Sequence, residues 1–173
     1  PHTALAHKGH TKNLEDALQY LKAAQCIEGD VAYVTKIVCD PSLPFAACFL
    51  RQLRQLQQQA LPLAPLDTLY LPILESIYPV PDRVWLPDVH AAVNQLELAQ
   101  QLGGVSQEKI GAWKRMMEFL GIGYRTGGGF HCVYHPQLLE AILRQWPLKE
   151  GSLQALLEGY LQDWLPCLTA RGD

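Results

Sequence analysis

Residues 105–136 constrain the fold of this chain most, because they encode a helix, a stop and a hairpin in direct succession. Ser106 suits an N-cap, since its hydroxyl can accept a hydrogen bond from a free amide of the first helical turn. Glu108 follows where the helix dipole favours an acidic side chain. Apolar residues then recur at helical spacing: Ile110, Trp113, Met117 and Leu120. We therefore expect an amphipathic helix over residues 106–120.

The residues after this helix predict a stop and a β-hairpin. Gly121 and Gly123 mark the end of the helix, since glycine tolerates the left-handed conformation that closes a last turn. Residues 124–125 and 130–134 read as two short strand arms around the glycine-rich tip at residues 126–129. The expected unit is therefore a helix followed directly by a tight hairpin.

A second helix is expected just ahead of this unit. Asp88 is placed to cap a helix that runs to Leu102, with Val89, Val93, Leu96 and Ala99 facing inward. Gly103 and Gly104 make the turn into the helix that begins at Ser106. Helix, short glycine turn and helix form a helix-turn-helix arrangement.

This succession of elements resembles the winged helix-turn-helix proteins. The resemblance covers residues 85–146 and lies in the order of the elements. It implies that the second helix enters a DNA groove while the hairpin, the wing, touches phosphate. Residues 104–146 carry five basic and three acidic side chains, a local net charge of +2 in a chain of net charge −3. The resemblance implies these nucleic-acid contacts: Lys109, Lys114, Arg115, Arg125 and Thr126.

The N-terminal half is predicted to be mainly helical. Residues 11–26 and 42–59 carry apolar side chains at helical spacing. Between them, residues 31–38 are β-branched and aromatic and predict a strand, with a helix as the alternative. Residues 67–78 read as a short helix interrupted at Pro72, inside a proline-rich connector.

Two domains are expected, with a boundary at residues 79–81. Residues 11–80 would form a helical domain, and residues 83–173 a winged-helix-like domain with a helical extension. Pro136 suits the first position of a helix after the hairpin, and Ser152 would cap an aromatic-rich final helix. The predicted fold class is mostly α with a small β-hairpin.

Composition narrows the class of protein. Apolar residues make up 49% and charged residues 18%, so the chain can bury a core. No apolar run approaches the ~20 residues that cross a bilayer. The five cysteines are widely spaced, which is typical of reduced, mostly buried thiols in a cytosolic protein. We expect a soluble, cytoplasmic protein without a membrane partner.

No residue pattern indicates catalysis, a metal or a cofactor. On a strand, His131 and His135 would point to one side and Cys132 to the other, and the chain offers no second pair of ligands. The same alternation separates Cys132 from His131 as a nucleophile and base. A nucleotide-binding glycine loop needs a strand before it and a helix after it, whereas residues 121–129 have the reverse order. The chain is therefore not expected to be an enzyme.

Two functions remain open from the sequence. The first is a non-catalytic nucleic-acid-binding protein, either a regulator or a component of a DNA-processing complex. The alternative is a protein-interaction and assembly module that uses the winged helix as a scaffold. A homodimer through the C-terminal helices is a further expectation, by analogy with other winged domains. A continuous basic face would favour DNA, and an exposed apolar patch would favour a protein partner.

Overall fold

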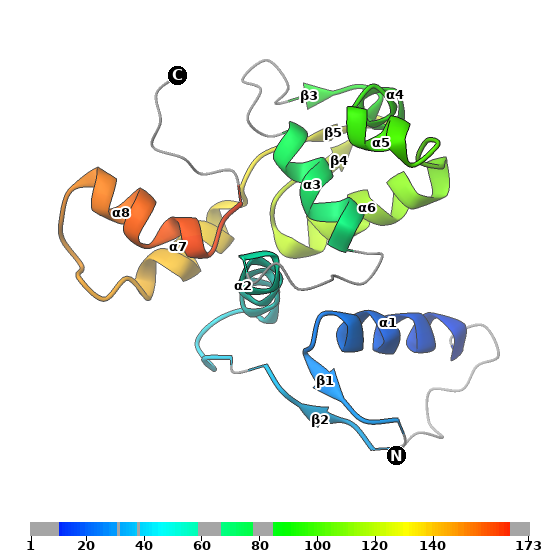
Figure 1. The fold of residues 1–173 in the computed structure, drawn as a ribbon. Helices are drawn as coiled ribbons and strands as arrows, with labels where there is room; N and C mark the ends of the chain where they lie inside the picture. The colour runs from blue at the N-terminus through cyan, green and yellow to red at the C-terminus, as the bar shows by residue number, and fades with distance from the viewer. Residues whose placement is uncertain (1–10, 31, 38, 59–66, 78–84, 167–173) are drawn as a thin grey trace.

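The chain is mostly helical, as expected, and contains two small antiparallel sheets where one β-hairpin was predicted. The computed structural model describes residues 11–30, 32–37, 39–58, 67–77 and 85–166 (Figure 1). The elements in chain order are α1 (Thr11–Ala23), β1 (Ile27–Glu28), β2 (Val34–Thr35), α2 (Phe45–Gln58), α3 (Asp67–Ile77), β3 (Trp85–Leu86), α4 (Val89–Asn94), α5 (Glu97–Gln101), α6 (Gln107–Leu120), β4 (Tyr124–Thr126), β5 (Gly129–His131), α7 (Pro136–Arg144), α8 (Leu153–Gly159) and the 3-10 turn η3 (Leu161–Asp163). No helix among the described residues is long and apolar enough to span a membrane.

The expected strand over residues 31–38 is much shorter than predicted. Only Val34–Thr35 form β2, which pairs with β1, and residues 31 and 38 lie outside the described residues. The side chains of residues 32–36 are exposed, so no apolar face is buried that would extend the pairing. The helix α3 runs through Pro72 without the expected interruption, and Ile73 and Leu74 just beyond it are fully buried.

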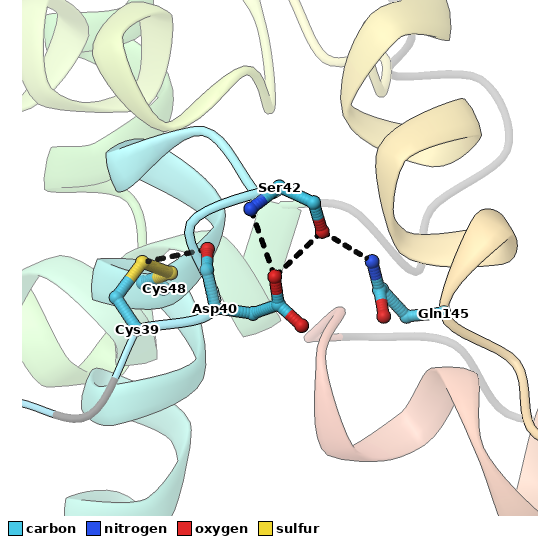
Figure 2. Close-up of a disulfide and its surroundings, with 5 residues drawn as sticks. All are labelled: Cys39, Asp40, Ser42, Cys48 and Gln145. Carbon is cyan, nitrogen blue, oxygen red and sulfur yellow. Dashed lines mark hydrogen bonds between the residues drawn. A yellow bond between two sulfur atoms is a disulfide. The ribbon is translucent and has the colours of Figure 1, made fainter.

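A disulfide fixes the loop that leads into α2. Cys39 and Cys48 are bonded, so the expectation that all cysteines are reduced is wrong for this pair (Figure 2). The bond closes a loop with a sequence separation of 9. By the loop-entropy model, a cross-link of this span stabilises the fold by about 2.5 kcal/mol. Cys26 and Cys132 are free and buried as predicted, and Cys167 lies outside the described residues.

The same loop is tied to α7 by a chain of hydrogen bonds. Asp40 Oδ1 accepts from the backbone N of Ser42 at 2.8 Å and from its Oγ at 2.6 Å. Hydrogen bonds from Ser42 lower the pKa of Asp40. Ser42 Oγ in turn accepts from Gln145 Nε2, just after α7, at 2.6 Å (Figure 2). Pro44 follows this turn and disfavours a helical conformation in the residue before it. The helix α2 therefore begins at Phe45 and not at residue 42.

The three-stranded sheet has the order β3-β5-β4, with both pairs antiparallel. Its inner face carries Leu86 and Phe130, which are buried. Phe130 packs against Trp113 of α6 with ring centroids 5.1 Å apart. The sheet therefore lies on α6, and β3 joins the hairpin at the edge opposite β4 (Figure 1).

The helix expected from Asp88 to Leu102 is broken into α4 and α5. Asp88 caps α4 as predicted, accepting from Ala91 N at 3.0 Å. The break follows Asn94, whose side chain accepts from Val105 N at 2.8 Å and donates to Val105 O at 3.1 Å. These two hydrogen bonds hold the end of α4 close to the start of α6. The chain then turns at Leu96 into α5.

The predicted caps and apolar face of α6 are confirmed. Ser106 Oγ accepts from Lys109 N at 3.3 Å, and Gly121 ends the helix in the left-handed conformation with φ 74°. The buried residues of α6 are the four that were expected: Ile110, Trp113, Met117 and Leu120. Pro136 and Ser152 also begin α7 and α8 as predicted. Leu153 at the start of α8 is exposed, and no residue of α8 is fully buried.

Buried residues from both halves of the chain belong to one hydrophobic core. Phe49 and Leu53 of α2 share it with Met117 of α6 and Ile142 of α7. The expected boundary at residues 79–81 lies outside the described residues, so the division into two domains stays a prediction.

The two neighbouring methionines of α6 test its orientation. Met117 is fully buried, whereas Met116 is only partly buried. We expect Met117→Ala to lower the free energy of unfolding by roughly 2–5 kcal/mol, because it leaves a cavity in the core. Met116→Ala is the matched control and should cost less than about 1 kcal/mol. Urea titration measures both, and equal losses would mean that α6 is rotated.

Candidate functional site

Aromatic packing holds the hairpin against α6, and a glycine leaves room for that packing. The rings of Trp113 and Phe130 are both fully buried and meet at an interplanar angle of 55°. Gly123 allows this contact, since a Cβ there would lie 2.3 Å from Cζ of Phe130. The helix and the hairpin therefore form one unit in which the hairpin tip has a fixed place beside α6.

The backbone of the hairpin tip is exposed to solvent. Gly127 and Gly128 have φ of 52° and 86°, as a two-residue type I′ turn requires at both positions. A Cβ at either position would have no neighbour within 4 Å. The turn therefore exposes its backbone over an open surface, with Thr126 and Gly129 as the closing pair of the hairpin.

An open groove runs between the hairpin tip and the exposed side of α6. Its volume is about 470 Å³. Its lining residues are Lys114, Glu118, Arg125, Thr126, Gly127, Gly128 and Gly129. Three of the five candidate contacts, Lys114, Arg125 and Thr126, therefore meet in one place. Lys109 and Arg115 are exposed on α6 but do not line the groove.

Glu118 is the member of the groove that the sequence did not suggest. Its Oε1 accepts from the backbone N of Arg125 at 2.7 Å, and its Oε2 accepts from Arg125 Nε at 2.6 Å. These two bonds hold the guanidinium across the groove wall, and the four N–H groups on its terminal nitrogens can still donate to a ligand. The carboxylate also cancels one positive charge, which leaves the groove at +1.

The three basic side chains of α6 are not held in ion pairs. Within the described parts of the chain, no carboxylate pairs with Lys109, Lys114 or Arg115. Their positive charges add to the electrostatic potential at the groove, but no ion pair there holds these side chains in place. The basic surface therefore consists of Arg125, which an ion pair orients, and three side chains that no ion pair among the described residues holds.

The histidines and cysteine after the hairpin do not lie on one strand. β5 ends at His131, so the alternation assumed for Cys132 and His135 does not apply. His135 is the N-cap of α7, and its Nε2 lies 2.9 Å from Gly123 O. Among the described residues, no three His, Cys, Asp or Glu side chains are placed to hold a metal ion.

A second, apolar hollow lies along α7. Its lining residues are Pro136, Leu139, Glu140, Leu143, Arg144 and Lys149, and its volume is about 700 Å³. Glu140 Oε1 and Arg144 Nη2 pair across one helical turn at 2.6 Å. The lining of this hollow also carries a net charge of +1, from Arg144 and Lys149 against Glu140, and it differs from the groove in the apolar side chains of Pro136, Leu139 and Leu143.

The two free thiols are shielded from reagents in the folded protein. Burial raises the pKa of Cys26 to about 11 and that of Cys132 to about 12. A raised thiol pKa means that the folded state disfavours the thiolate relative to the unfolded chain. The free energy of unfolding is therefore at its full value at pH 8, and it falls as pH rises toward the pKa values of the folded state. We expect iodoacetamide at pH 8 to leave both residues unmodified in the native state and to modify both in urea, as measured by peptide mass spectrometry. Rapid alkylation of native Cys132 would contradict its burial.

The chemistry of the groove follows from its own residues. They supply a fixed guanidinium, an ammonium, a hydroxyl and the open backbone of a glycine turn.

No family model, curated protein or solved structure matches the chain.

Proposed function

We propose that this chain is a non-catalytic nucleic-acid-binding protein, a regulator or a component of a DNA-processing complex. Duplex DNA is contacted by α6 and by the hairpin tip. The observation that carries the proposal is the groove that joins Lys114, Arg125 and the glycine turn. Guanidinium, ammonium, hydroxyl and backbone N–H groups are the donors that proteins use to hold phosphate.

The order of the elements supports the same reading. The helices α4 to α6 are followed directly by the hairpin β4–β5, the order on which the resemblance to winged helix-turn-helix proteins rests. In such a domain, α6 is the recognition helix and the hairpin is the wing. The short α5 lies in the turn between the two helices and leaves Lys109 and Arg115 of α6 exposed.

Electrostatics sets the expected strength of binding. If Lys109, Lys114, Arg115 and Arg125 neutralise about four phosphates, log affinity falls against log salt with a slope of roughly −3.6. Glu118 repels phosphate at the centre of this surface, and the whole chain carries −3. Binding is therefore expected to be moderate and strongly dependent on salt.

The apolar hollow along α7 favours the alternative function. Leu143, which lines the hollow, is exposed, and this suits the apolar face of a partner helix. In that case the chain is a protein-interaction module, and the basic surface of α6 only keeps it in solution. The two functions use different surfaces, so the same variants distinguish them.

The pairing of Arg125 with Glu118 gives a sharp test. Fluorescence anisotropy with a labelled duplex at about 50 mM salt should show weaker binding for Arg125→Ala on every sequence, because a phosphate contact is lost. Glu118→Gln should bind about two- to fivefold more tightly, the scale of one exposed charge interaction.

The ion pair of α7 supplies matched controls. Arg144→Ala and Glu140→Gln break a pair with the same 2.6 Å separation outside the groove. Both should bind the duplex as the unchanged protein does. Absence of duplex binding at tens of micromolar protein, with the fold intact by circular dichroism, would refute the DNA proposal in favour of the protein-interaction module.

A further inference from the structure

The outer face of the three-stranded sheet carries a row of three neighbouring rings, of which Tyr124 and His131 stack while Trp85 is tilted against His131. Trp85 of β3, His131 of β5 and Tyr124 of β4 are direct neighbours in the strand register. The ring centroids of Trp85 and His131 are 4.5 Å apart, and those of Tyr124 and His131 are 4.8 Å apart. After this stacking, Trp85 is still 39% exposed and Tyr124 41% exposed.

The row is held in position by the backbone beneath and beside it. Trp85 lies directly over Gly129, where a Cβ would come within 2.2 Å of its Cη2 atom. On the other side, the ring of His135 lies 6.2 Å from that of Tyr124, and His135 is itself held by Gly123 O at 2.9 Å. The exposed ring surface is therefore preorganised for a partner.

The aromatic row adjoins the basic groove. Alternate residues of a strand share a face, so Thr126 lies on the same side of β4 as Tyr124, whereas Arg125 between them lies on the opposite side and bonds Glu118 of α6. The row and the groove therefore lie on opposite sides of β4 and meet at its edge. Thr126 also lines the groove with Lys114 and Arg125. A ligand that covers both surfaces has to present anions to the groove and flat rings to the row. Unpaired nucleotides next to a duplex have this combination, because their bases are no longer covered by stacking within the helix.

We propose that the aromatic row binds unpaired bases of a single-stranded extension, while the groove holds the adjoining duplex. This binding is noncovalent. This inference rests on the proposed duplex binding and names its substrate class more closely, as a junction between double- and single-stranded nucleic acid. Stacking of one base on an exposed ring is worth roughly five- to a hundredfold in affinity, whatever its sequence.

Blunt and tailed duplexes test this inference. Anisotropy would compare a labelled blunt duplex with the same duplex carrying a single-stranded thymidine tail of about six nucleotides, at equal salt. The unchanged protein should bind the tailed duplex about tenfold more tightly, because stacking adds to the phosphate contacts. Tyr124→Ala should lose most of this preference and keep its affinity for the blunt duplex.

Further variants separate stacking from folding. Trp85→Phe retains a ring over Gly129 and should keep part of the preference, whereas Trp85→Ala should lose it. Tyr33→Ala is the matched control, because Tyr33 is 37% exposed in the N-terminal half, outside both surfaces. Its tail preference should not change.

The outcomes separate the two proposals. Equal affinity of the unchanged protein for blunt and tailed duplex would overturn the stacking site and leave duplex binding in place. A tail preference that survives both Tyr124→Ala and Trp85→Ala would also overturn it. No binding of the blunt duplex would overturn the proposed function and this inference together.

Discussion

The contact between Trp113 and Phe130 is the interaction on which the rest of the C-terminal part depends. It joins the centre of α6 to the central strand of the sheet, with both rings removed from water. Burial of two such rings contributes several kcal/mol, and their tilted packing adds about 1 kcal/mol. Because the central strand is anchored in this way, the hairpin tip cannot swing away from α6. The basic groove and the aromatic row both follow from that one attachment.

The two faces of the sheet have separate roles. The inner face is hydrophobic and closes the core against α6. The outer face keeps three rings in contact with one another and partly in contact with solvent. On the side of α6, Glu118 fixes Arg125 while limiting the positive charge beside it. A surface of this kind favours a defined geometry over high nonspecific affinity, which agrees with a chain of net charge −3.

The local parts of this arrangement could be predicted from the sequence. Ser106, Gly121 and the apolar spacing of α6 act within one or two helical turns, and all are as expected. The hairpin was also predicted, but its tip is shorter than the expected residues 126–129, because Thr126 and Gly129 pair and only Gly127 and Gly128 form the turn. The grouping of Lys114, Arg125 and Thr126 followed from placing a hairpin directly after a helix.

The remaining features depend on contacts between residues far apart in the sequence. The break between α4 and α5 comes from Asn94 bonding to Val105, which no periodicity of apolar residues reveals. The Cys39–Cys48 disulfide depends on the path of the loop before α2. It removes the support that reduced cysteines gave to a cytoplasmic location, which stays a prediction. Glu118 was missed because its partner lies beyond the helix, on the first strand of the hairpin.

The central claim is that α6 and the hairpin tip meet DNA as one surface. Hydrogen–deuterium exchange with and without a duplex tests it directly, because the exposed amides of the glycine turn exchange freely unless a ligand covers them. The account predicts slower exchange in residues 125–129 and along the exposed side of α6 when the duplex is bound. Unchanged exchange in these residues under saturating duplex, with slowing elsewhere, would contradict it.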